Sequence, residues 1–159
     1  MTDLAARLET RYSVETTVIA QDLSAPNAAQ ALVDRLEENN LRVDSLINNA
    51  GFGLFGDFLS MKPDRLTQMI DLNVRFLTDL TRLLLPQLQA SGRGVLVNIA
   101  STAAYQPLPG MAAYAASKAY VLSLTEALSY ETKGTGLKVL ALSPGPTKTE
   151  FFGNSEDSA

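Results

Sequence analysis

The sequence of 159 residues contains neither cysteine nor histidine, and these two absences narrow its chemistry. Without cysteine there are no disulfides, no thiolate nucleophiles and no thiolate metal sites. Without histidine, a Ser-His-Asp triad and a histidine-ligated zinc site are excluded within this chain. Proton transfer must therefore use Tyr, Lys, Asp or Glu, and we predict no metal site.

Positive charge and long apolar runs are also scarce. The formal net charge is −4, and no basic run is present. A nucleic-acid partner is therefore not expected, since phosphate binding needs clustered Lys and Arg. The run Leu83–Leu85 is too short to span a membrane, and residues 1–4 lack the basic and apolar regions of a signal peptide. A cytoplasmic globular protein fits these features best.

Strand and helix patterns alternate along the chain. This alternation predicts an α/β fold with a parallel sheet and helices on both faces. The strands are continuous apolar runs, as expected when both faces of a sheet are covered. We expect one domain over residues 1–152 and a polar, disordered tail over 153–159. About four strands are predicted, at 16–20, 43–48, 95–100 and 137–142, with helices at 3–12, 26–39, 63–90 and 111–133.

Polar or glycine-rich segments follow each predicted strand. Ligands of such sheets bind outside the carboxyl ends of the strands. We therefore expect these segments, far apart in the sequence, to converge on one edge of the sheet. They are Asp22 after the first strand, 48–51 after the second, Ser101 after the third and 143–149 after the fourth.

Tyr114 and Lys118 lie four residues apart in the last predicted helix. This spacing places both side chains on one helix face, one turn apart. A lysine ammonium near a phenol favours the phenolate, so Tyr114 is a candidate general acid/base. For the pair alone, the alternative interpretation is a solvated helix face.

The segment Gly51–Gly56 matches the pattern Gly-x-Gly-x-x-Gly, and Asp71 lies 20 residues beyond Gly51. A dinucleotide fingerprint needs a helix directly behind the glycines and an acidic residue at the end of the next strand. Here the next helix begins at Pro63, and Asp71 lies inside a helical pattern. We therefore interpret the segment as an apolar loop that lines a cleft.

Taken together, the polar positions form an ordered set that resembles the short-chain dehydrogenase/reductase family, classical type. The resemblance extends from about Asp22 to Thr149 and implies a Rossmann-like fold. It also implies hydride transfer between NAD or NADP and a carbonyl compound or secondary alcohol. The matching elements, in order, are Asn48-Asn49-Ala50-Gly51, Asn73, Ser101, Tyr114 with Lys118, and Pro144-Gly145.

The resemblance implies four catalytic residues. Tyr114 would exchange a proton with the substrate, and Lys118 would support it and bind the nicotinamide ribose. Ser101 would hydrogen-bond the substrate oxygen, and Asn73 would hold a water of a proton relay. The alternatives are that Asn73 satisfies backbone groups in a buried helix and that Ser101 is a helix or turn cap.

The resemblance also implies a cofactor-binding set. Asp22 and Leu23 would contact the adenine, although Asp22 as a cap of the following helix is an alternative. The segment 49–51 would lie along the cofactor, and Thr147 and Thr149 would meet its carboxamide and pyrophosphate side. The full set is Asp22, Leu23, Asn49, Ala50, Gly51, Tyr114, Lys118, Pro144, Gly145, Thr147 and Thr149. Near it, Phe52, Leu54, Phe55, Tyr105 and Met111 suggest an apolar pocket.

The family's glycine-rich phosphate loop, Thr-Gly-x-x-x-Gly-x-Gly, is absent from this sequence, as are its first two strands and its C-terminal part. We therefore expect an incomplete Rossmann sheet with exposed edges and weakened pyrophosphate binding. A second hypothesis is an inactive fragment that acts only through assembly, as a homodimer or homotetramer paired through the helices near 63–90 and 111–133. A methyltransferase is a third, distant analogy, which gives no reason for Tyr114 and Lys118.

Overall fold

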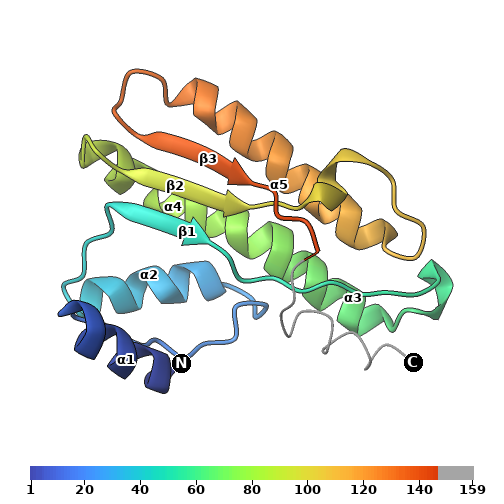
Figure 1. The fold of residues 1–159 in the computed structure, drawn as a ribbon, viewed down its shortest axis with the longest axis horizontal. Coiled ribbons are helices and arrows are strands. Elements are labelled where there is room, and N and C mark those ends of the chain that lie inside the picture. Colours follow the sequence, from blue (N-terminus) through green and yellow to red (C-terminus); the bar gives the residue numbers. More distant parts are fainter. Residues whose placement is uncertain (147–159) are drawn as a thin grey trace.

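The computed structural model describes residues 1–146, and these form a three-stranded parallel sheet with helices. The strand order equals the chain order, and the carboxyl ends of the strands point to the same side of the molecule (Figure 1). The predicted α/β fold with a parallel sheet is confirmed. The strands are β1 (Ser45–Asn48), β2 (Val95–Ile99) and β3 (Lys138–Leu142).

The predicted strand at 16–20 is wrong, so the described residues form three strands and not about four. The backbone N–H of Thr16 donates to Oε1 of Glu9 at 3.1 Å instead of to a neighbouring strand. Val18 is exposed. A β-branched run favours a strand only where a partner strand supplies hydrogen bonds and packing, and no such partner lies beside this segment in the described part of the chain.

The helices lie between Thr2 and Glu131. The predicted long helix over 63–90 is present but has three parts, of which the middle one has π geometry. Such π segments often mark functional sites. The helices are α1 (Thr2–Tyr12), α2 (Ala28–Glu38), α3 (Pro63–Ile70), the π segment η2 (Asp71–Phe76), α4 (Leu77–Ala90) and α5 (Ala112–Glu131), with short 3-10 turns η1 (Phe58–Ser60) and η3 (Thr102–Tyr105).

In the described residues the helices cover one face of the sheet, not both. Helices α4 and α5 lie behind the strands in Figure 1, and Leu88 of α4 packs with Leu96 of β2 in a buried cluster. On the opposite face Ile47, Leu140 and Leu142 are 65%, 54% and 56% exposed. The strands carry apolar residues on both faces, as predicted, but only one face has a helical layer here.

A buried polar network fixes α4 and α5 to the sheet. Asn48 at the end of β1 donates through Nδ2 to Thr81 of α4 at 3.0 Å and to Oδ1 of Asn98 in β2 at 2.8 Å. Nδ2 of Asn98 donates to Oγ1 of Thr125 in α5 at 2.9 Å. All four side chains are buried. Because buried amides are costly without partners, this network favours one position of α5 over the strands.

Among residues 1–146, none of the helices has the length and apolar character needed to cross a membrane.

Candidate active site

Helix α5 places Tyr114 and Lys118 one turn apart and buries both, at 8% and 6% exposure. The Nζ atom of Lys118 lies 5.9 Å from the centroid of the Tyr114 ring. A solvated helix face, the alternative for this pair, is therefore wrong. Tyr130 and Lys133 provide a contrast, since Lys133 Nζ lies only 3.6 Å from the Tyr130 ring centroid while Tyr130 is 73% exposed. Burial, not proximity alone, distinguishes the first pair.

Lys118 is also attached to the sheet. Its Nζ donates a 2.7 Å hydrogen bond to the carbonyl oxygen of Ile99, the last residue of β2. Burial lowers the pKa of Lys118 to about 8, because a low-dielectric environment disfavours the ammonium form.

Asn73 lies in the π segment η2 and clamps the loop that follows β1. Its Oδ1 accepts from the N–H of Phe52 at 3.2 Å, and its Nδ2 donates to the carbonyl oxygen of Phe52 at 2.9 Å. Nδ2 also donates to Oγ of Ser117 at 3.2 Å. Asn73 thus satisfies backbone groups, as the structural alternative predicted, but those groups belong to a distant loop.

Ser117 is a residue of this cluster that the sequence patterns did not identify. It is buried, and its hydroxyl accepts from Asn73 while donating to the carbonyl oxygen of Tyr114 at 2.7 Å. It therefore connects η2 to α5 directly beside Lys118. The only sequence signal was a serine inside a helix, and such a hydroxyl commonly bonds its own helix backbone.

Gly51 permits the close approach of its loop to Asn73 and Lys118. A Cβ atom at Gly51 would lie 2.9 Å from Oδ1 of Asn73 and 3.7 Å from Nζ of Lys118. The glycine is needed for close approach, and no helix opens directly behind the segment 51–56, since η1 begins at Phe58. The interpretation of the glycine motif as something other than a phosphate loop is thus consistent with the structure.

Ser101 is the N-cap of η3, and its Oγ accepts from the N–H of Ala103 at 3.1 Å. Ser101 therefore acts as a cap, as the alternative predicted. Its hydroxyl hydrogen takes no part in this hydrogen bond. The chain that leaves β2 is also bonded to the chain that leaves β3, because the N–H of Thr102 donates to the carbonyl oxygen of Pro144 at 3.1 Å. Two of the predicted polar segments thus meet at the carboxyl edge of the sheet.

Asp22, Leu23 and Ala50 line one hollow of about 340 Å³, together with residues of α3 and η2. The hydroxyl and N–H of Ser24 donate to Oδ1 of Asp22 at 2.7 and 2.9 Å and hold the pKa of Asp22 below its ordinary value. The cap alternative for Asp22 is wrong, because the N-cap position of α2 is Asn27.

The remaining residues of the predicted cofactor-binding set lie after β1 and after β3. Asn49 is exposed directly after β1. Gly145 follows Pro144 after β3. Thr147 and Thr149 lie outside the described residues. Within residues 1–146 there is no group of three or more His, Cys, Asp or Glu side chains that could hold a metal ion.

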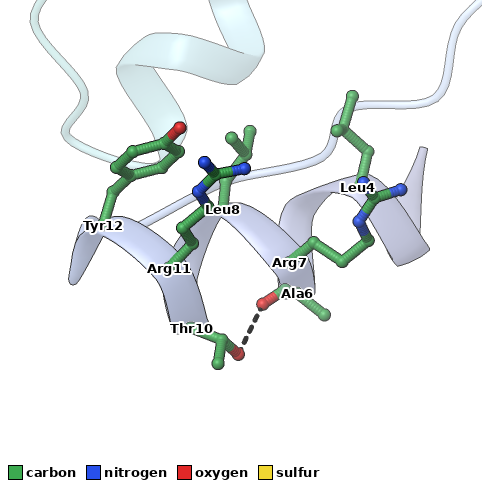
Figure 2. A pocket seen from close by; sticks show the side chains of 7 residues that line it. All are labelled: Leu4, Ala6, Arg7, Leu8, Thr10, Arg11 and Tyr12. Carbon is green, nitrogen blue, oxygen red and sulfur yellow. Dashed lines mark hydrogen bonds between the residues drawn. The ribbon is translucent and has the colours of Figure 1, made fainter.

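A larger hollow, of about 460 Å³, lies on the surface of α1 and contains none of the predicted site residues. Figure 2 shows its lining side chains along a single helix, with Thr10 bonded to the carbonyl oxygen of Ala6. No residue of α1 is buried. Volume alone therefore does not identify the functional site of this protein.

Comparison with known proteins agrees with this geometry. The chain is 37% identical over 158 residues to sulfoacetaldehyde reductase 2 of Chromohalobacter salexigens, an alignment that covers 95% of this chain and 60% of the relative. A short-chain dehydrogenase from Sphingobium yanoikuyae, solved in complex with NADPH, superposes with a TM-score of 0.88 at 35% identity and covers 98% of this chain and 60% of the other.

A third similar protein is the bulky-bulky ketone specific alcohol dehydrogenase from Comamonas testosteroni. Its structure superposes with a TM-score of 0.84 at 33% identity and covers 92% of this chain and 59% of the other. The chain thus spans about 60% of the length of these relatives. The methyltransferase analogy is wrong, since the family model described as short chain dehydrogenase matches residues 1–159. The chain belongs to the short-chain dehydrogenase family.

Proposed function

We propose that this chain carries the proton-transfer part of an NAD(P)-dependent oxidoreductase site, with Tyr114 as the general acid/base. The observation that supports this most strongly is the buried pair of Tyr114 and Lys118, in which Lys118 is bonded to Ile99. A buried tyrosine beside an ammonium is suited to give and recover a proton. The substrate would be a carbonyl compound in one direction and a secondary alcohol in the other.

Each of the site residues has a distinct role in this proposal. The Tyr114 hydroxyl donates its proton to the substrate oxygen during reduction, and the Lys118 ammonium stabilises the phenolate that remains. Ser101 donates its hydroxyl hydrogen to the same oxygen and stabilises charge there. Both amide hydrogens of Asn73 are used, so a relay water would have to donate to the second lone pair of its Oδ1.

The residues present fit a nicotinamide dinucleotide in part. Asp22, Leu23 and Ala50 line a hollow suited to the adenine, with an acceptor for its amino group and an apolar wall. Gly51 has no side chain to obstruct the cofactor, and Lys118 keeps two of its three N–H donors for ribose hydroxyls. When bound, the nicotinamide supplies the hydride. The family's glycine-rich phosphate loop is not in this sequence.

The experiment is a turnover assay of the chain with NADH and NADPH and a panel of carbonyl compounds, with cofactor binding measured separately from nucleotide fluorescence. Tyr114→Phe should remove turnover without removing cofactor binding. Tyr130→Phe, at the exposed pair, should leave turnover unchanged. Unchanged turnover in Tyr114→Phe would sink the assignment of this residue.

A second candidate function is assembly without catalysis. The observation in its favour is the outer surface of α4 and α5, where Tyr120 is 42% exposed and its hydroxyl lies 3.1 Å from Oγ1 of Thr78. Pairing of α4 and α5 with their copies would cover this surface. A dimer in light scattering that Tyr120→Glu dissociates, together with no saturable NADH or NADPH binding, would favour this function. A monomer would count against it. The cytoplasmic location stays a prediction.

A further inference from the structure

We propose that the active site takes a neutral carbonyl compound or secondary alcohol with a bulky apolar group, and that it disfavours carboxylate or sulfonate substrates. This inference rests on the proposed function and specifies its substrate class. It is based on four exposed side chains that we call the apolar rim: Phe55, Phe58, Leu59 and Tyr105.

The apolar rim is unusually exposed for side chains of this kind. Phe55 and Tyr105 are 65% and 66% exposed, Phe58 is 57% exposed, and Leu59 is 96% exposed. Exposed apolar patches on protein surfaces commonly mark binding sites. The rim comes from two segments: Phe55, Phe58 and Leu59 lie between β1 and α3, and Tyr105 is the last residue of η3.

These two loops are bonded to each other. The N–H of Gly56 donates to the carbonyl oxygen of Gly110 at 2.9 Å. The Phe55 ring lies over Gly110, since a Cβ atom there would be 3.5 Å from its Cε2. Gly110 has a φ of 78°, which also favours glycine. Phe55 is thus held against the segment that leads into α5.

The apolar rim is also fixed relative to Tyr114. Leu54, next to Phe55, is 2% exposed and belongs to the same buried cluster as Tyr114. Ala103, two residues before Tyr105, belongs to this cluster too. Met111 packs against it from the start of α5. Both rim loops therefore rest on the core that holds the proposed acid/base.

The charge of the two loops determines the substrate class. Segments 51–61 and 101–113 contain no Lys or Arg, and Asp57 is their only charged residue. Lys62, which ends the first loop before α3, already has an interaction of its own. A carboxylate or sulfonate substrate needs a cation to replace its hydration. Lys118 is bonded to Ile99, and the guanidinium of Arg65 lies over the Phe52 ring, 4.8 Å from its centroid, in the hollow of Asp22. Neither of these cations belongs to the rim loops, which therefore favour a neutral, apolar substrate group.

The test is a titration of the 159-residue chain, labelled with ¹³C at its methionine methyl groups, with benzophenone and with 4-carboxybenzophenone. These ketones differ by one carboxylate. Benzophenone should shift the Met111 signal saturably. The carboxylate compound should bind at least about tenfold more weakly, a difference of about 1.4 kcal/mol in binding free energy. Met1, at the chain terminus, is the internal reference. Equal or tighter binding of the carboxylate compound, or no saturable shift of Met111 with benzophenone, would overturn the inference.

Variants of the rim sharpen the test without disturbing the core. Phe55→Ala and Tyr105→Ala should each weaken benzophenone binding severalfold, and Tyr130→Ala should not, because Tyr130 lies at the far end of α5. Phe55→Arg should reverse the preference in favour of the carboxylate compound. Unchanged binding in both alanine variants would contradict the rim as the binding surface.

Failure of this inference and failure of the proposed function give different results. Ketone binding needs no Tyr114 hydroxyl, so Tyr114→Phe should still bind benzophenone. If Tyr114→Phe binds the ketone but keeps turnover, the proposed function is wrong. If Tyr114→Phe loses turnover but the chain prefers the carboxylate ketone, only the substrate class is wrong.

Discussion

The Nζ atom of Lys118 donates a 2.7 Å hydrogen bond to the carbonyl oxygen of Ile99, which ties the first half of α5 to the last residue of β2. The ammonium is therefore held in a buried place beside Tyr114, and not at the surface where lysines usually lie. Its position has consequences for stability and for the proposed proton transfer.

The first prediction concerns pH. The folded-state pKa of Lys118 is lowered to about 8 by burial, from 10.5, so between these values the unfolded chain binds more protons than the folded one. Stability from this group therefore rises as pH increases from about 8 to 10.5, by on the order of 3 kcal/mol in total. The measurement is the free energy of unfolding from urea titrations of the wild type and Lys118→Met at pH 7 to 11.

The Lys118→Met variant is the control for all other titrating groups. The difference between wild type and variant should be flat near pH 7 and should grow in favour of the wild type above pH 8. A difference that stays constant from pH 7 to 11 would show that Lys118 titrates normally.

The second prediction concerns Gly51. Gly51→Ala should displace the Asn73 side chain, because the added Cβ would lie 2.9 Å from its Oδ1. Overpacking of this kind costs about 1–3 kcal/mol, measurable as a lower urea midpoint. Gly145→Ala is a matched control, because a Cβ there meets no atom of residues 1–146 within 4 Å. Equal effects of the two substitutions would contradict the clamp between Asn73 and this loop.

The third prediction concerns the polar network under the sheet. Thr125→Val keeps the shape of the side chain but removes the acceptor of the Asn98 amide. A buried donor without a partner costs about 1–3 kcal/mol, which thermal or urea unfolding would detect. Thr10→Val removes a similar hydroxyl, bonded to Ala6 on exposed α1, and should change stability by less than about 0.5 kcal/mol. If Thr125→Val leaves the free energy of unfolding unchanged, the network does not hold α5 in place.

The fourth prediction concerns Ser117. Ser117→Ala should remove the bridge between Asn73 and the Tyr114 carbonyl, and leave one Asn73 amide hydrogen without its partner. We expect a loss of about 1–3 kcal/mol in the free energy of unfolding and a shift of the Asn73 side-chain amide signals in NMR spectra. Ser123→Ala, on the exposed side of α5, should change neither. Unmoved Asn73 amide signals in Ser117→Ala would refute the bridge.

Local patterns predicted most of the helices and strands within a few residues, because periodicity and breakers act along the chain. Pro63 begins α3 and Gly134 follows the end of α5, as expected for an N1 proline and a terminating glycine. The interruption by η2 was not predicted, because residues 71–76 contain no proline or glycine to mark a change in the helix.

The sequence by itself determined that this chain has no His or Cys for proton transfer, and that Tyr114 and Lys118 share one helix face. Composition and spacing are sufficient for this, since both act locally. Only the tertiary structure decided that 16–20 is not a strand, that Asn73 binds the loop at Phe52 and that Ser117 joins Asn73 to α5. These outcomes depend on groups supplied by distant segments, because a strand needs a partner and a buried amide bonds whichever polar atoms the fold places beside it.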